Sequence, residues 1–373
     1  MSNCILFDDY RWEQLLPLTF TRPVAGLRIG IDTIAEKWNY ALQSTVSYLC
    51  ESYLSEKFPP HFSEDNFYIN GGLIPDEKLC NTIDQLKPHE ILIQNGEIIA
   101  FRSSDNYFSR NSMLEHAKTF SPIEYTGQIV SVSRPWHIFQ LNDSILRNDF
   151  KRITQNKTAQ KISASNTLIG ENIFIEEGAI MEAATVNSKS GPVYIGKYAE
   201  VMEGSMLRGP VAVGAHSTIK MGAKIYGATT IGPHSKVGGE LNNVVIQAFS
   251  NKAHDGFLGN AVLGEWCNLG ADTNNSNLKN NYTEVKLWDY ATQKFISTGL
   301  QFCGLIMADH SKCGINTMFN TGTVIGVSSN IFGDGFPRNF IPSFSWGGAA
   351  GFTTYKLQDA MNVAEEVMKR RNI

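Results

Sequence analysis

Residues 195–238 read IGKYAEVMEGSMLRGPVAVGAHSTIKMGAKIYGATTIGPHSKVG, and this stretch repeats with a period of six. An aliphatic residue opens eight consecutive hexapeptides: Ile195, Val201, Leu207, Val213, Ile219, Ile225, Ile231 and Val237. The next position is often glycine, and the fifth position is mostly small. A period of six fits neither a helix nor a flat strand, whose periods are about 3.6 and 2. It is typical of a solenoid in which each hexapeptide forms one short strand and one corner, with the aliphatic side chain inside.

The same register continues on both sides of this stretch. It occurs earlier at Ile169, Ile175 and Met181, resumes at Phe257, Leu263 and Leu269, and resumes again at Ile306, Met318 and Val324. Two segments, 239–256 and 275–302, break the phase. We expect both to leave the solenoid as loops, and loops on a rigid scaffold are where binding and catalytic residues tend to lie.

The chain before the repeat is typical of a mixed α/β domain. The pattern predicts strands at Cys4–Phe7, Phe67–Ile69 and Glu90–Ile93, a hairpin from the last of these through Asn95-Gly96 to 97–101, and helices over 31–42 and 134–150. The polar residues 151–165 are expected to form a linker. An apolar stripe of Leu357, Met361, Ala364 and Met368 predicts a terminal helix. We therefore predict an α/β domain over 1–155, a solenoid over 156–350 and a C-terminal helix over 351–373.

Composition excludes several classes of protein. The 373 residues carry 32 Lys and Arg against 36 Asp and Glu, so clustered positive charge for a nucleic-acid partner is not expected. A charged share of 18% argues against disorder and against a coiled coil. The start has no signal-peptide pattern, and no run approaches the ~20 apolar residues of a membrane span. We expect a cytoplasmic protein whose six cysteines are reduced and packed rather than zinc-bound.

The repeat resembles the left-handed β-helix acyltransferases. Residues 252–279 (KAHDGFLGNAVLGEWCNLGADTNNSNLK) resemble the acetyltransferase half of the bacterial bifunctional N-acetylglucosamine-1-phosphate uridylyltransferase/glucosamine-1-phosphate acetyltransferase family. The matches are His254, the Leu258-Gly259 pair, Gly264 and the Asn268–Ala271 run with Thr273. This resemblance implies a left-handed parallel β-helix, acetyl-CoA as acyl donor, a small-molecule acceptor and a homotrimer with its site between adjacent solenoids.

The same resemblance implies roles for individual residues. His254 would be the general base that takes a proton from the acceptor amine, a role that suits a pKa near neutrality. Substrate or coenzyme A would contact six further residues: Arg208, Lys220, Lys252, Phe257, Asn277 and Lys279. Phe257 replaces a tyrosine of the family, and Lys279 stands where the family has an aspartate. His310, which follows Asp309, is the competing histidine, while His216 and His234 are expected to be exposed.

The first domain resembles a shortened sugar nucleotidyltransferase. Residues 15–23 (LLPLTFTRP) are similar to a proline-containing element of that family. Phe67–Pro75 (FYINGGLIP) is similar to a segment at the end of one of the family's strands. Gly72 stands where the family has a magnesium-binding aspartate, and the loop after the first strand has no glycine. Magnesium is therefore expected only if this domain is an active nucleotidyltransferase, and we predict no other metal.

Four cations of this domain are candidates for holding a phosphate: Arg11, Arg22, Arg28 and Lys37. Arginine matches phosphate oxygens well, but structural ion pairs with nearby acids explain the same residues equally well. Residues 331–348, rich in glycine, proline and aromatics, fit a pantetheine or acyl channel or, as we prefer, a packing segment.

Three functions compete at this point. The first is acetyl-CoA-dependent acyl transfer to an amino sugar phosphate or a nucleotide sugar. The second is nucleotidyl transfer to a sugar 1-phosphate by the N-terminal domain. The third is a scaffold that binds a nucleotide sugar without turnover.

Overall fold

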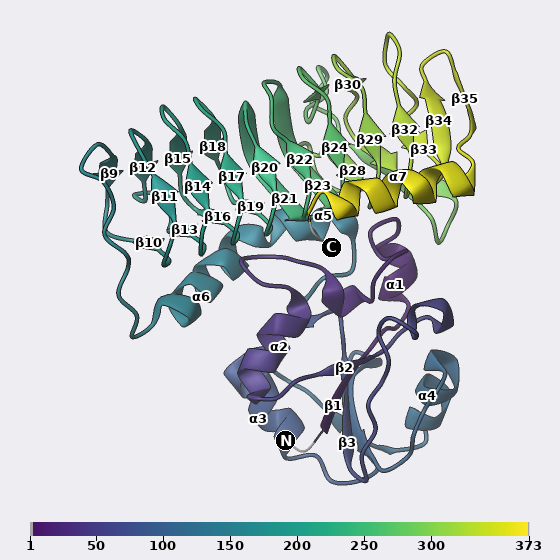
Figure 1. Cartoon of the computed structure of the whole chain (residues 1–373). Coiled ribbons are helices and arrows are strands. Elements are labelled where there is room, and N and C mark those ends of the chain that lie inside the picture. Colours follow the sequence, from purple (N-terminus) through teal and green to yellow (C-terminus); the bar gives the residue numbers. More distant parts are fainter. Residues whose placement is uncertain (1–2, 372) are drawn as a thin grey trace. The chain divides into compact units, whose positions relative to one another are not determined.

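The computed structural model describes residues 3–371 and 373, and it divides into two compact units (Figure 1). One unit combines the residues up to Leu27 with Asp32–Arg134. The other combines Arg28–Ile31 with Pro135–Ile373. The second unit thus begins before the boundary expected at residue 155, because two helices that precede this point, α5 (Pro135–Gln140) and α6 (Asn142–Thr154), pack with the solenoid.

The first unit is a six-stranded mixed sheet with helices. Its strands run in the order β2 (Ser47–Leu49), β1 (Asn3–Phe7), β3 (Asn66–Asn70), β6 (Glu97–Ser103), β5 (Glu90–Gln94) and β7 (Ser121–Glu124). Strands β1, β2 and β3 are parallel. The helices are α1 (Arg11–Gln14), α2 (Ile34–Leu42), α3 (Glu77–Asp84) and α4 (Arg110–Ala117), and a small pair joins β4 (Leu73–Ile74) to β8 (Val130–Ser131). The predicted mixed α/β character is confirmed.

Local sequence accounts for two details of this unit. Helix α2 begins at Ile34 rather than at the predicted residue 31, because Thr33 and Glu36 form a capping box at its start. The hairpin predicted from Asn95-Gly96 is confirmed, since β5 and β6 pair antiparallel and both turn residues have a positive φ. The core of the sheet includes Tyr68 stacked on Phe101, with ring centroids 4.7 Å apart.

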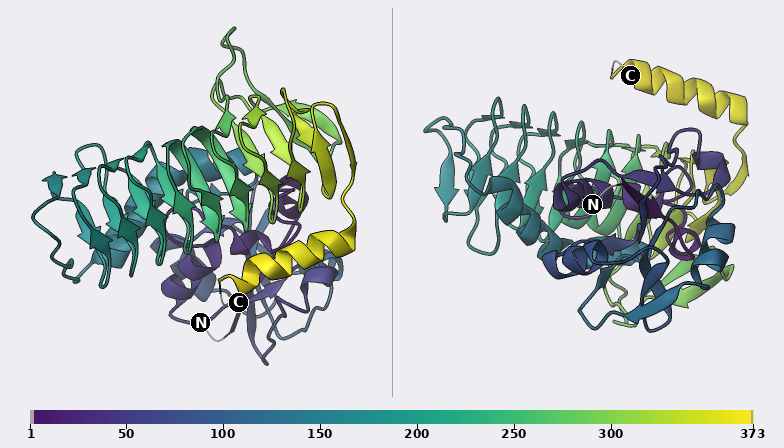
Figure 2. Two further views of the ribbon diagram at one scale, coloured as in Figure 1. Left: turned by 45° about the horizontal axis from the view of Figure 1, so that its top comes forward. Right: turned by 90° about the horizontal axis from the view of Figure 1, so that it is seen from below.

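The second unit is a parallel β-solenoid with three faces (Figures 1 and 2). The first face carries β10 (Ile173–Ile175), β13 (Val193–Ile195), β16 (Val211–Val213), β19 (Thr229–Ile231), β28 (Leu305–Met307), β31 (Thr323–Ile325) and β33 (Phe340–Ile341). The second carries β11 (Ile180–Met181), β14 (Glu200–Val201), β17 (Thr218–Ile219), β20 (Lys236–Val237), β22 (Asn251–Lys252), β24 (Asn268–Leu269), β29 (Lys312–Cys313), β32 (Asn330–Ile331) and β34 (Ser345–Gly348). The third carries β9 (Thr167–Ile169), β12 (Thr185–Asn187), β15 (Met206–Arg208), β18 (Lys224–Tyr226), β25 (Asn274–Asn275) and β30 (Met318–Phe319), while β21 (Glu240–Ala248) and β23 (Phe257–Glu265) run from the third face to the first.

The hexapeptide prediction is confirmed. All eight aliphatic positions from Ile195 to Val237 are buried in one core cluster. Ile195 pairs with Val213 and Val213 with Ile231, so one coil takes 18 residues, or three hexapeptides. Each coil therefore buries three aliphatic side chains in the narrow interior, where stacking removes them from water.

The prediction that residues 239–256 form a loop outside the solenoid is wrong. Most of the first half of this segment forms β21, which lies in the sheet between β18 and β23. Thr230 pairs with Val245 and Lys236 with Asn251, a spacing of 15 residues instead of 18. The phase breaks because this coil is shorter, and the three faces continue without interruption.

The second predicted insertion, 275–302, is confirmed. Leu263 pairs with Met307, 44 residues further on, so the insertion adds 26 residues to a normal coil of 18. Within it, β26 (Lys286–Asp289) and β27 (Lys294–Ser297) form an antiparallel hairpin. An isolated bridge between Leu278 and Phe302 closes the base of the insertion.

The predicted register is one residue out near these irregular coils. The inward residues after the insertion are Met307, Cys313, Phe319, Ile325 and Ile331, instead of Ile306, Met318 and Val324. Likewise Leu258, and not Phe257, belongs to the core. An insertion whose length is not a multiple of six shifts the phase, and a shift of one residue exchanges the inner and outer sides of a strand.

The predicted linker and tail are both attached to the solenoid. Helix α6 continues to Thr154, and beyond it the Gln160 amide donates to the carbonyl of Ile175 while Ile162 packs on the core. At the other end β35 (Gly351–Thr354) pairs antiparallel with β34. The predicted terminal helix is α7 (Leu357–Lys369), and it runs alongside the coils (Figure 2).

The apolar stripe of α7 is only partly covered. Ala360 and Ala364 are buried, whereas Leu357 and Met361 are exposed. Just beyond the helix, Arg371 donates to the carbonyl of His234 at 2.9 Å and to Asn251 Oδ1 at 3.0 Å. In the described part of the chain, no helix has the length and apolar character needed to cross a membrane.

Candidate functional site

His254 lies in the corner loop between β22 and β23, and its side chain is exposed. Gly256 makes this corner possible. It has a φ of +113°, and a Cβ there would come within 2.2 Å of the Thr273 carbonyl oxygen. The loop is thus held tightly against the next coil while the imidazole stays accessible. An accessible histidine on a fixed loop suits proton transfer to or from a bound ligand.

Lys252, predicted to contact substrate, lies inside the solenoid. Its ammonium donates to the carbonyls of Gly238 and Asp255 at 3.2 and 3.1 Å, and to the carbonyl of His254. Burial lowers the pKa of this lysine to about 8. We therefore leave Lys252 out of the candidate ligand site, because its donors are occupied in holding the His254 corner.

Phe257 and Asn277 lie together on the coil after this corner. A Cβ added at Gly259 would meet the Phe257 ring at 2.5 Å and Asn277 Nδ2 at 2.8 Å, so both side chains crowd over this glycine. Asn277 Nδ2 donates to Asn260 Oδ1 at 2.8 Å. This cluster is three residues from His254 along the chain, so the solenoid brings these three predicted residues to one region.

Lys220 and Arg208 lie further along the solenoid. Lys220 occupies the equivalent corner two coils before the His254 loop, and its Cβ is 3.1 Å from the Cβ position of Gly238. Arg208 is exposed at the end of β15, on the third face, three coils before Gly259. With a strand spacing of about 4.8 Å, these separations along the axis are roughly 10 and 14 Å. Lys220 and His254 lie at the corner between the second and third faces, whereas Arg208 lies at the opposite edge of the third face.

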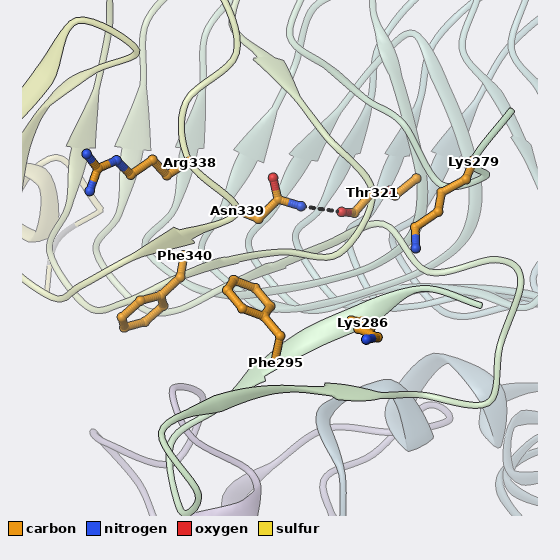
Figure 3. Close-up of a pocket in the computed structure, with 7 residues that line it drawn as sticks. All are labelled: Lys279, Lys286, Phe295, Thr321, Arg338, Asn339 and Phe340. Carbon is orange, nitrogen blue, oxygen red and sulfur yellow. Dashed lines mark hydrogen bonds between the residues drawn. The ribbon is translucent and has the colours of Figure 1, made fainter. Parts of the chain in front are cut away.

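Lys279 lines a separate pocket of 570 Å³ at the base of the inserted hairpin (Figure 3). The other lining residues are Lys286, Phe295, Thr321, Arg338, Asn339 and Phe340. These residues come from the insertion and from the two coils that follow it. Sequence reasoning identified the insertion as a place for a site, but it did not link Lys286 and Arg338, because the fold brings them together from 52 residues apart.

The competing histidines belong to an aromatic ladder along another corner of the solenoid. Six rings stack one per coil with centroid separations of 4.3–6.1 Å: Tyr198, His216, His234, Phe249, Trp266 and His310. All six residues have a left-handed φ, between 53° and 61°. His216 is exposed as predicted, while His234 is half-buried. Stacking on Trp266 gives His310 a packing role, which leaves His254 as the better candidate for catalysis.

In the first unit, Arg11 is buried and forms ion pairs with Asp9 and Glu97. Asn70 Nδ2 donates to Asp9 Oδ2 at 2.8 Å, so the cluster lies where β1 and β3 end. The chain reverses its strand order between β1 and β3, and open α/β sheets bind ligands at such points. A small cavity of 240 Å³ beside Arg11 and Glu97 also marks this position.

These residues do not fit a magnesium site. Asp9 and Glu97 are occupied by the Arg11 guanidinium, and burial raises the pKa of Asp8 to about 8, so that carboxyl is largely protonated at neutral pH. Among residues 3–371 and 373, no group of three or more His, Cys, Asp or Glu side chains is placed to hold a metal ion.

The other predicted phosphate ligands are Arg22, Arg28 and Lys37. Arg28 belongs to the solenoid unit, where its Nε donates to the Gln247 carbonyl at 3.1 Å and Gln247 bonds back to its backbone. The solenoid unit, and not the first unit, therefore contains Arg28, and its role as a phosphate ligand stays a prediction. Lys37 is buried and donates to the Asp32 carbonyl at 3.1 Å, and Arg22 is buried as well.

The chain thus joins a nucleotidyltransferase-like α/β unit to a parallel β-solenoid. Residues 4–158 match the family described as Sugar nucleotidyl transferase. The predicted resemblance to bifunctional nucleotidyltransferase/acetyltransferases is confirmed by two archaeal relatives in particular.

The first relative is a bifunctional sugar-1-phosphate nucleotidylyltransferase/acetyltransferase of Sulfurisphaera tokodaii. It is 30% identical over 212 residues, which cover 56% of this chain and 46% of the relative. The second is the bifunctional protein GlmU of Methanococcus vannielii, 26% identical over 267 residues that cover 70% of this chain and 55% of the relative. The chain therefore spans about half the length of the curated relatives it matches.

Among solved structures, an Arabidopsis UDP-N-acetylglucosamine acyltransferase matches 54% of this chain and 77% of its own chain. Its sequence identity is 13% and its TM-score is 0.25.

Proposed function

We propose that this protein transfers an acyl group from acetyl-CoA to an amino sugar phosphate or a nucleotide sugar. The observation that carries this proposal is the exposed His254 imidazole on a tightly held corner, next to the Phe257–Asn277 cluster. In this proposal His254 accepts a proton from the acceptor amine as the amine attacks the thioester carbonyl. The thiol of coenzyme A is the leaving group, and an amide is formed.

The surrounding cations have a supporting role in this proposal. Lys220 lies at the corner before the third face and Arg208 at the far edge of that face, and both would attract the phosphates of the acceptor or of coenzyme A. The name of the Sulfurisphaera tokodaii relative combines nucleotidyl and acetyl transfer, which supports the reaction class. A homotrimer is proposed with it, and sedimentation equilibrium of the full chain would measure the state of assembly.

The test is release of coenzyme A thiol from acetyl-CoA with glucosamine 1-phosphate as acceptor. We expect turnover by the unaltered chain and a loss of at least about a hundredfold for His254→Ala. His310→Gln is the matched control, because it keeps a polar side chain in the ladder and should retain activity. Turnover that His254→Ala leaves unchanged would contradict the proposal. No turnover with any amino sugar would favour the scaffold alternative.

Nucleotidyl transfer is the second candidate, and the family match over residues 4–158 favours it. The pairing of Arg11 with Asp9 and Glu97 argues against the usual metal-assisted form of this reaction. Release of pyrophosphate from a nucleoside triphosphate and a sugar 1-phosphate, with and without Mg²⁺, would measure it. Magnesium-dependent release would establish this activity independently of His254.

A further inference from the structure

The pocket at the base of the inserted hairpin has the chemistry of an anion site. Lys279, Lys286 and Arg338 contribute three positive charges, and none of the seven described lining residues is acidic. Lys279 Nζ donates to the Glu284 carbonyl at 2.6 Å, which fixes its position and leaves two N–H groups for a ligand. Within the described chain, neither Lys286 nor Arg338 forms an ion pair. Three uncompensated cations around one cavity favour a ligand with more than one negative charge.

An aromatic wall lies on one side of the same pocket. Phe340 stacks on Trp288 with ring centroids 4.3 Å apart, and Phe295 meets Trp288 edge-on at 5.4 Å. Trp288 and Phe295 are direct cross-strand partners in the hairpin, so the hairpin itself fixes the wall. Phe295 is still 43% exposed, which leaves ring surface free to stack with a planar group.

A polar pair completes the lining. Asn339 Nδ2 donates to the carbonyl of Thr321 at 2.8 Å (Figure 3). This bond orients the amide and leaves Asn339 Oδ1 as an acceptor. A ligand that suits the whole lining therefore carries phosphates for the cations, a flat ring for Phe295 and a donor for the amide.

We infer that this pocket binds the nucleoside diphosphate part of a ligand, with the phosphates on Lys279, Lys286 and Arg338 and the base on Phe295. Its volume of 570 Å³ is within the usual range of about 300–1,000 Å³ for small-molecule sites. Arginine can hold a phosphate through two parallel hydrogen bonds, which lysine cannot. The inference deepens the proposed function and rests on it for the source of the ligand, since acetyl-CoA and a nucleotide sugar both contain such a group.

Calorimetric titration of the full chain tests the inference with three probes: ADP, adenosine and inorganic pyrophosphate. We expect ADP to bind more tightly than either fragment. Lys286→Ala and Arg338→Ala should each weaken ADP about tenfold or more, the usual effect of removing a charged hydrogen bond. Phe295→Ala should weaken ADP and leave pyrophosphate unchanged.

Lys294→Ala is the matched control, because Lys294 lies on the same hairpin and does not line the pocket. Absence of ADP binding at millimolar concentration would overturn the inference. So would ADP binding that the double variant of Lys286 and Arg338 leaves unchanged, because the nucleotide would then occupy another site, such as the first unit.

Binding and turnover separate this inference from the proposed function. ADP binding that depends on these residues, in a chain that releases no thiol, would overturn the proposed function alone. Thiol release with unchanged KM for acetyl-CoA and for a nucleotide-sugar acceptor in the double variant would overturn the inference alone.

Discussion

The side chain of Arg11 fills the space that a side chain at position 72 would need, since a Cβ added at Gly72 would lie 2.7 Å from Arg11 Cδ. Gly72 stands where the resembling family has a metal-binding aspartate. An aspartate there would collide with an arginine that is buried and held by Asp9 and Glu97. The positive charge beside Asp9 and Glu97 is therefore the guanidinium of Arg11.

The first prediction concerns the competition between Arg11 and a side chain at position 72 for the same space. Gly72→Asp should destabilise the first unit, because the buried Arg11 cannot move aside without breaking its ion pairs. Arg11→Ala should also destabilise it, by about 3–5 kcal/mol, since it leaves Asp9 unpaired. In urea unfolding, the double variant should lose less unfolding free energy than the sum of the losses of the two single variants. Additive losses would mean that the two positions do not compete for space.

The second prediction concerns Asp8, whose pKa is raised to about 8 by burial. Its Oδ1 accepts from the Val24 amide at 2.9 Å, while its Oδ2 has no hydrogen-bond partner among the described residues. In the unfolded chain the carboxyl ionises near 3.8, so its contribution to stability is complete below that pH and is lost as the pH rises toward 8. Asp8→Asn should remove this loss and stabilise the protein at pH 8.

Urea midpoints at pH 5 and pH 8 would check it. From pH 5 to pH 8, the urea midpoint of Asp8→Asn should rise relative to that of the unaltered chain. A constant difference would show that Asp8 is ionised in the folded protein.

The third prediction concerns Lys252. Lys252→Met keeps the apolar stem and removes the ammonium that bonds to three carbonyls below the His254 corner. We expect a loss of about 2–4 kcal/mol, because buried carbonyls would lose their donor. Since the folded pKa of about 8 is below the ordinary value of 10.5, the unaltered chain should gain stability as the pH rises from 8 toward 10.5, and the variant should not.

Chemical unfolding of both chains at pH 7.5 and pH 10 is the measurement. A methionine variant as stable as the unaltered chain would mean that the lysine does not support this corner. If Lys252→Met also lowers acyl transfer while His254 is intact, the lysine is a positioning residue.

The fourth prediction concerns His234 in the aromatic ladder. Burial and the nearby charges of His216 and Arg371 lower its pKa from 6.5. The folded protein therefore favours the neutral imidazole, and the contribution of His234 to stability is full above pH 6.5 and is lost as the pH falls below it. His234→Phe should keep the stack and make unfolding less dependent on pH between 7 and 5.5. His61→Phe, at an exposed position outside the ladder, is the control for replacing a histidine by phenylalanine.

Sequence alone predicted the parts of the fold that repeat. The run from Ile195 to Val237 fixes coil length and core because one spacing holds throughout. The predicted register was wrong at Met307 and Leu258. Coils of 15, 17 or 44 residues shift the phase there, and the spacing of the repeat does not predict the size of these shifts. The Asn95-Gly96 turn was predictable because its chemistry is local.

The candidate site was predictable only in part, for the same reason. His254 lies in the corner of a continuous coil and not in the predicted insertion loop, whereas Phe257 and Asn277 do meet. Three other features depend on contacts between residues far apart in the chain. Lys252 is buried inside the solenoid, Arg28 belongs to the solenoid unit, and Lys286 and Arg338 line the same pocket. No pattern of spacing contains that information.

The two ends of the solenoid are finished differently, which gives the coils a direction in which they separate. In the part of the chain that the structure describes, strands β9, β10 and β11 each pair with a strand on one side only, and Leu168 and Ile180 of this first coil are 47% and 61% exposed. At the other end β35 turns back along β34 and covers the last strand of the second face. Because each coil is supported only by its neighbours, unzipping should start at the first coil, and amide hydrogens of residues 167–187 should exchange before those of the middle coils.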